Sequence, residues 1–166
     1  MRDETTPLLD FGARADAFRP IDDRVMGGVS QSRMTASADG TAVFSGTLSR
    51  ENNGGFASVR AAGLDLDLTE ATHLVLRVRG DGRTYKLRLH DDTRFDGVAF
   101  ESRFDTTADA WVEVELPIDA FRPVWRGRLV QDAPPLNRAA VVSVGLMVSE
   151  GPDGAFSLEL EPLAAR

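Results

Sequence analysis

Apolar and polar residues alternate with a period of two along most of the chain, as expected when successive strand side chains point to opposite faces of a sheet. Residues 84–90 (TYKLRLH), for example, place Tyr85, Leu87 and Leu89 on one face and three basic side chains on the other. No long segment shows the 3.6-residue period of an amphipathic helix. The pattern therefore predicts an all-β protein.

Turn-forming residues divide this pattern into short strands. We expect strands at residues 25–37, 41–49, 55–61, 72–79, 84–90, 98–104, 111–116, 140–149 and 155–161. Asp39-Gly40, residues 80–83 (GDGR) and residues 151–154 (GPDG) each favour a hairpin. Residues 117–136 contain several prolines and predict a long connection with one helical turn at 118–121.

Short antiparallel strands with one long crossing are typical of a jelly-roll β-sandwich. The 166 residues fit a single domain over residues 1–166, and this length is enough to bury a substantial core. The chain contains no cysteine, which excludes disulfides and Cys-ligated metals. We expect packing to hold the fold together.

The charge and hydropathy of the chain limit the classes of partner that it is expected to bind. The net charge is −7 and the isoelectric point is about 4.8, so we expect no nucleic-acid partner. No apolar run approaches the roughly 18 residues of a membrane helix, so the chain is not expected to span a membrane. The N-terminal residues are polar and acidic, without the apolar core of a signal peptide, and we expect a cytoplasmic location.

Basic residues recur on the polar face of two predicted strands. If residues 72–79 and 84–90 pair through the turn at 80–83, one sheet face gathers Arg77, Arg79, Lys86, Arg88 and His90, beside Glu101 and Arg103. Such a face could bind carboxylates, phosphates or sugar hydroxyls. An ordinary solvated face of an antiparallel sheet is the more frequent explanation.

Histidines and paired acids offer little for catalysis or metal binding. His73 and His90 show no triad or metal spacing, and Asp91 and Asp92 beside His90 are typical of a turn. The pairs Asp22-Asp23 and Asp91-Asp92, with Asp96, could bind a structural calcium ion, although loop capping is the commoner role. We therefore expect a protein that is not an enzyme, with no cofactor beyond a possible structural calcium.

Several strings together resemble the complex I intermediate-associated protein family. They are residues 22–30 (DDRVMGGVS), 44–49 (FSGTLS), 51–58 (ENNGGFAS), 79–87 (RGDGRTYKL), 121–123 (FRP) with 126–128 (RGR), and 144–149 (VGLMVS). The resemblance extends over about residues 8–162. It implies a galactose-binding-like jelly roll, similar to carbohydrate-binding modules, and eukaryotic members of the family act as assembly factors for mitochondrial respiratory complex I.

The resemblance also indicates which polar residues could face a ligand or partner. These residues are Asp23, Asn53, Arg79, Asp81, Lys86 and Arg126, to which the basic face adds Arg88 and the long connection adds Trp125 as an interface anchor. The leading hypothesis is a non-catalytic protein that assists respiratory complex assembly by binding a protein partner, such as a respiratory subunit. The alternative is a carbohydrate- or small-molecule-binding module that uses the sheet face or the loop rim.

Overall fold

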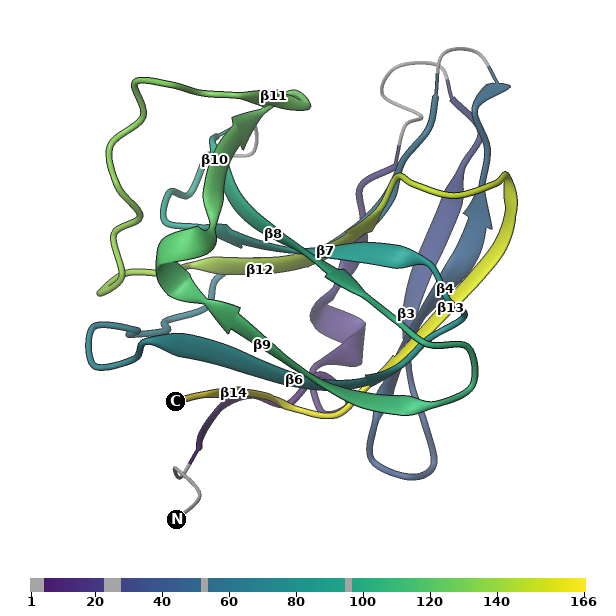
Figure 1. The fold of residues 1–166 in the computed structure, drawn as a ribbon, viewed down its shortest axis with the longest axis horizontal. Helices are drawn as coiled ribbons and strands as arrows, with labels where there is room; N and C mark the ends of the chain where they lie inside the picture. The colour runs from purple at the N-terminus through teal and green to yellow at the C-terminus, as the bar shows by residue number, and fades with distance from the viewer. Residues whose placement is uncertain (1–4, 23–27, 52–53, 95–96) are drawn as a thin grey trace.

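Two antiparallel sheets form a β-sandwich in the computed structural model, which describes residues 5–22, 28–51, 54–94 and 97–166 (Figure 1). Sheet A has the order β1 (Thr6–Leu9), β14 (Leu163–Ala165), β6 (His73–Arg79), β13 (Gly154–Leu160), β4 (Ala42–Leu48), β3 (Gln31–Ala36), and β9 (Trp111–Pro117) also pairs with β6. Sheet B has the order β11 (Arg128–Leu129), β10 (Arg122–Trp125), β8 (Ala99–Asp105), β7 (Thr84–His90), β12 (Ser143–Val148), β5 (Ala57–Ala61), β2 (Arg19–Pro20). Two single 3₁₀ turns, η1 (Ala15–Ala17) and η4 (Ile118–Ala120), lie in the connections.

The core fills the space between the two sheets, where the apolar positions of the alternating strands meet. Tyr85 and Leu87 of β7 are fully buried, and so are Leu74 and Leu76 of β6. Aromatic rings join the two layers: the Phe44 ring of β4 lies 6.1 Å from the Tyr85 ring, centroid to centroid. The expected all-β jelly-roll sandwich is confirmed.

Most expected strands are present, and the short ones at the ends of the chain were missed. Strands β1, β2 and β14 contain two to four residues, which is too few to show a period of two. The first expected strand is shorter in the described residues, since β3 begins at Gln31, and residues 25–27 of that prediction lie outside them.

The proline-rich connection is not the uninterrupted loop that its composition predicted. The helical turn is confirmed as η4, but β10 and β11 follow it and pair with each other. Arg126 and Gly127 join them with φ values of 49° and 79°, the left-handed geometry of a two-residue hairpin turn. Pro117 precedes this hairpin, Pro123 lies within β10, and Pro134 and Pro135 follow it. Because proline is unfavourable in strands, the sequence predicted a loop here.

Of the three expected hairpins, one is confirmed and two are wrong. Asp39-Gly40 joins β3 to β4, which pair directly. Residues 80–83 instead lead from β6 in sheet A to β7 in sheet B, and residues 151–154 lead from β12 in sheet B toward β13 in sheet A. Glycine and aspartate permit a sharp change of direction, but they do not decide whether the next strand pairs or crosses.

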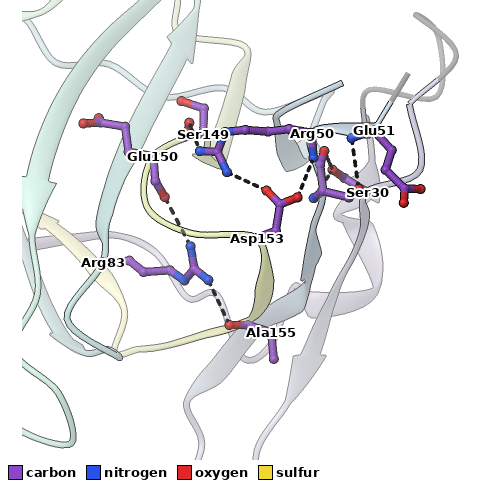
Figure 2. A network of polar contacts seen from close by, with 9 residues as sticks. Ser30, Arg50, Glu51, Arg83, Ser149, Glu150, Asp153 and Ala155 are labelled. Carbon is purple, nitrogen blue, oxygen red and sulfur yellow. Dashed lines mark hydrogen bonds and ion pairs between the residues drawn. The ribbon is translucent and has the colours of Figure 1, made fainter. Parts of the chain in front are cut away.

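The two crossings are tied together by Asp81 and Arg83. The Asp81 carboxylate accepts hydrogen bonds from the Arg83 backbone N–H (3.1 Å), the Tyr85 hydroxyl (3.0 Å) and the Ser157 backbone N–H (2.9 Å). The Arg83 guanidinium donates to the carbonyl oxygens of Glu150 and Ala155, both at 3.2 Å (Figure 2). Each inter-sheet connection therefore holds the other in place.

Arg50 secures the same connection from the far side. Its guanidinium lies 2.6 Å from Asp153 Oδ1 and donates to the Ser149 carbonyl oxygen at 3.4 Å, and its backbone N–H donates to Asp153 Oδ2 at 3.1 Å (Figure 2). The end of β4 is thereby joined to the connection between β12 and β13.

We expect the Tyr85→Phe substitution to destabilise the fold by about 1.5–3 kcal/mol, the range for hydrogen bonds to charged groups. Burial, followed by the charge of Asp81, raises the pKa of Tyr85, so its hydroxyl remains a donor across the working pH range. Urea unfolding would measure the loss. Thr84→Val removes a more exposed hydroxyl, 2.7 Å from Asp105, and should cost less; equal losses for the two variants would contradict the proposed role of Tyr85.

Candidate functional site

The outer face of sheet B carries a group of charged side chains that we call the outer-face cluster: Arg60, Lys86, Arg88, His90 and Glu101. Strand alternation turns the basic residues of β7 outward, since the residues between them are in the core. Cross-strand pairing of Gly145 with both Arg60 and Arg88, and of Arg88 with Glu101, sets these residues in one row.

Glu101 is the carboxylate that two cations of the cluster share. Its two oxygens lie 3.3 Å from Arg88 Nε and 3.7 Å from Lys86 Nζ, and Lys86 also donates to Ser149 Oγ at 3.1 Å. On the other side of Gly145, Arg60 Nη1 lies 3.0 Å from His90 Nε2. The cluster therefore combines a carboxylate shared by Arg88 and Lys86 with a contact between the Arg60 guanidinium and the His90 imidazole.

His90 is held neutral within this cluster. Only 3% of the residue is exposed, and burial, followed by the charges of Arg60 and Arg88, lowers the pKa of His90 to about 3 against a weak opposing effect of Asp92. Burial also lowers the pKa of Arg88; Glu101 opposes this shift, and the charge of Arg60 adds to it. The two guanidiniums are thus close enough to repel each other while both remain charged.

The β10–β11 hairpin is a second exposed feature, standing at one end of sheet B (Figure 1). The residue Trp125 is 43% exposed and Leu129 is 58% exposed, and the Arg126 guanidinium lies 4.6 Å from the Trp125 ring centroid. Exposed apolar surface beside a stacked arginine is typical of a protein interface.

The Trp125 side of the hairpin and the outer-face cluster do not form one surface. Arg122 of β10 pairs with Glu101 and so faces the cluster, and Val124 and its cross-strand partner Leu129 lie on the same face. Trp125 is three residues beyond Arg122 along the strand, and strand alternation therefore turns it to the opposite face. The outer-face cluster and the Trp125 side of the hairpin are therefore two separate surfaces.

The predicted site residues fall into several groups. Lys86 and Arg88 belong to the outer-face cluster, and Trp125 and Arg126 to the hairpin. The carboxylate of Asp81 is engaged in the internal contacts between the two crossings. Asp23 and Asn53 lie outside the residues that the structure describes.

Arg79 lies apart from these groups, on the outer face of sheet A. Its guanidinium lies 2.8 Å from Glu159 and 5.6 Å from the Trp111 ring centroid. The expectation that Arg77 and Arg79 gather with the basic residues of β7 is wrong, because β6 and β7 lie in different sheets.

Sequence reasoning missed Arg60 and Leu129. Residues 57–61 alternate, so the outward direction of Arg60 was readable, but its position near Arg88 depends on β12, a strand far along the chain, lying between β5 and β7. Leu129 gave a weaker signal, as one apolar residue in a segment that was predicted to be a loop.

Among the described residues, no group of three histidine, aspartate or glutamate side chains could hold a metal ion. Asp22 Oδ1 accepts hydrogen bonds from Ser32 Oγ (2.5 Å) and the Ser58 N–H (3.0 Å). Asp92 accepts hydrogen bonds from the backbone and side chain of Arg94. Asp23 and Asp96, which the calcium hypothesis also used, lie outside the described part of the chain.

The His90 environment predicts a loss of stability on mild acidification. Unfolded His90 takes up a proton as the pH falls through 6.5, whereas the folded state does so only near pH 3. The stabilising contribution is therefore complete above pH 6.5 and is lost as the pH falls toward 3. Between pH 7 and 5 it decreases by about 2 kcal/mol.

We expect His90→Gln to reduce this pH dependence by about 2 kcal/mol over the same interval, as measured by urea unfolding at each pH. His73→Gln replaces the other histidine, on β6, and serves as the control for a histidine substitution elsewhere in the fold. If His90→Gln lost as much stability between pH 7 and pH 5 as the unsubstituted protein does, a buried neutral His90 would be ruled out.

The sequence has relatives among mitochondrial proteins. Complex I intermediate-associated protein 30 of Drosophila melanogaster is 28% identical over 95% of this chain and 62% of that protein. The probable complex I intermediate-associated protein 30 of Caenorhabditis elegans is 29% identical over 81% of this chain and 45% of that protein. The Mus musculus protein is 31% identical, and the match covers 59% of this chain and 31% of the mouse protein. This chain thus spans less than two thirds of the length of these relatives.

These names contradict the expected cytoplasmic location, since all three relatives are named as mitochondrial proteins. A polar N-terminal segment without an apolar run does not specify a compartment. No helix in the described residues has the length and apolar character needed to cross a membrane.

Solved structures with the same fold include carbohydrate-binding modules. The family 11 module of the cellulosomal cellulase Lic26A-Cel5E of Clostridium thermocellum superposes with a TM-score of 0.72 at 14% identity, covering 99% of this chain and 96% of the module. The family 11 module of Clostridium thermocellum in complex with a β-1,3-1,4-mixed-linked tetrasaccharide gives a TM-score of 0.71, also at 14% identity. The superposition covers 99% of this chain and 97% of that module. At this identity, the likeness establishes the fold alone.

The sequence model described as Complex I intermediate-associated protein 30 matches residues 9–160, which cover most of both sheets, from the end of β1 to the end of β13. The family resemblance of the strings at 22–30, 44–49 and 51–58 is thereby confirmed. This chain belongs to the Complex I intermediate-associated protein 30 family.

Proposed function

We propose that this protein assists the assembly of respiratory complex I as a non-catalytic protein that binds a protein partner. Membership of the Complex I intermediate-associated protein 30 family carries this proposal. The partner would be a subunit or an intermediate of the complex.

The β10–β11 hairpin is the surface that we assign to this partner. Trp125 is exposed on the face that it shares with its cross-strand partner Arg128, and Leu129 is exposed on the other face, beside Val124. Arg122, Arg126 and Arg128 make the hairpin basic although the protein as a whole is acidic. This composition favours an acidic patch on the partner with an apolar centre that receives Trp125.

The lowered pKa of His90 argues against acid–base catalysis by this residue. General acid–base catalysis favours a group whose pKa is close to the working pH. Burial and the adjacent guanidiniums lower the pKa of His90 to about 3, so the imidazole neither gains nor loses a proton near pH 7. The best candidate that the sequence offered for acid–base chemistry is therefore poorly suited to it.

The outer face of sheet B also argues against carbohydrate as the ligand. Small-molecule sites are lined mainly by apolar and aromatic side chains, and aromatic rings present flat surfaces for stacking. The central row of this face instead consists of Arg60, Gly145, Arg88 and Glu101. Its chemistry suits a charged group better than a neutral sugar.

Affinity capture tests the proposal. The tagged protein, bound in detergent-solubilised lysate of its own organism, should retain complex I subunits identified by mass spectrometry. The Trp125→Ala/Arg126→Ala double variant should lose at least about tenfold of the captured subunits, because central tryptophan and arginine residues contribute most to interface energies.

Trp111→Ala/Arg77→Ala is the matched control, since Arg77 stacks on Trp111 at 5.4 Å on the outer face of sheet A. This variant also removes one tryptophan and one stacked arginine, and it should capture the same subunits as the unsubstituted protein. Capture that contains no complex I subunit would refute the assembly role, and equal loss in both variants would refute the assignment to the hairpin.

A further inference from the structure

We propose that the outer-face cluster is a binding site for an oxyanion, a phosphate or a carboxylate group, held between Arg60 and Arg88 above Gly145. This site is separate from the hairpin assigned to the protein partner, and the proposal does not depend on that assignment.

The register of sheet B brings the two guanidiniums together. Arg60 and Arg88 lie on strands β5 and β7, and both pair with Gly145 of the intervening strand β12. Two strand spacings separate their backbones, about 10 Å, which is a distance that two arginine side chains can bridge. Glycine leaves the space between them without a side chain.

Gly145 is also required by its backbone neighbours. A Cβ at this position would lie 2.9 Å from the Val59 carbonyl oxygen and 3.6 Å from Arg60 Cβ. A larger residue would therefore disturb β5 as well as fill the space between the arginines. Glycine at this position thus places no side chain between Arg60 and Arg88.

The cluster holds positive charge at a cost that an anion would reduce. Arg60 and Arg88 repel each other, and the carboxylate of Glu101 is divided between Arg88 and Lys86. His90 Nδ1 is buried and has no hydrogen-bond partner among the described residues, and Arg88 Nε is buried with only its 3.3 Å ion-pair contact to Glu101. Buried polar groups without such partners are uncommon and often mark a functional site.

An oxyanion matches the donors of this site. The planar guanidinium fork of arginine fits both carboxylate and phosphate oxygens through paired hydrogen bonds. His90 contributes no positive charge because it is neutral, so the charged donors beside Gly145 are Arg60 and Arg88. A neutral ligand would gain little from this arrangement, whereas an anion would relieve the repulsion between the arginines.

Thermal unfolding in the presence of oxyanions tests the proposal. Inorganic phosphate and citrate are titrated separately, each against sodium chloride at the same ionic strength. A ligand at about 100 times its Kd should raise the unfolding midpoint by about 5–10 °C in a protein of this size. A response to phosphate alone or citrate alone identifies the oxyanion chemistry, and either one supports the site.

Arg88→Gln should abolish the shift. Arg103→Gln is the matched control on the same sheet, because Arg103 is 60% exposed and makes its ion pair with Glu150 instead of with the cluster. The control should respond like the unsubstituted protein. Arg60→Gln provides an independent second variant if Arg88→Gln does not fold, and it should also lose the response.

Two results would overturn the oxyanion site. The first is a midpoint that rises no more with phosphate or citrate than with sodium chloride. The second is a shift that persists in both Arg60→Gln and Arg88→Gln, which would place the anion elsewhere. Subunit capture through the hairpin is measured separately, so failure of the two proposals can be distinguished.

Discussion

The sandwich depends on the contacts that lock two inter-sheet crossings together at one end of the molecule. One carboxylate, Asp81, accepts hydrogen bonds from its own connection, from β7 and from β13. One guanidinium, Arg83, donates to the carbonyl oxygens of the other connection. These contacts fix how sheet A meets sheet B, because the chain changes sheets at both points. The aromatic core between Phe44 and Tyr85 then has a defined spacing to fill.

Locking the crossings also positions the outer face of sheet B. Lys86 follows the first crossing and donates to Ser149 at the start of the second, so the cluster is continuous with the contacts that secure the fold. β12 lies between β5 and β7, and this order brings Arg60 and Arg88 to either side of Gly145. The half-buried charges of this face are therefore consequences of topology. The burial of His90, followed by the charges of Arg60 and Arg88, lowers its pKa and keeps it neutral.

This chain shares its fold, but few of its residues, with the carbohydrate-binding modules. The likeness of the backbones covers nearly the whole chain, yet only 14% of the aligned residues are identical. On the central row of sheet B this sequence places arginine, glycine and glutamate. Fold alone therefore does not specify what binds to the sheet, and the side chains of each face must be considered separately.

The sequence by itself determined the class of fold, the family, and the faces of most strands, because strand alternation is a local property that needs no partner strand. Tyr85, Leu87 and Leu89 were correctly predicted to face the core, and Lys86 and Arg88 to face outward. Only the tertiary structure decided which strands pair. It separated Arg79 from Arg88, brought in Arg60 from a distant strand, and formed the Trp125 hairpin within a proline-rich segment. Turn residues allow the chain to reverse or to cross between sheets with similar ease, and the choice is made by packing between residues far apart in the sequence.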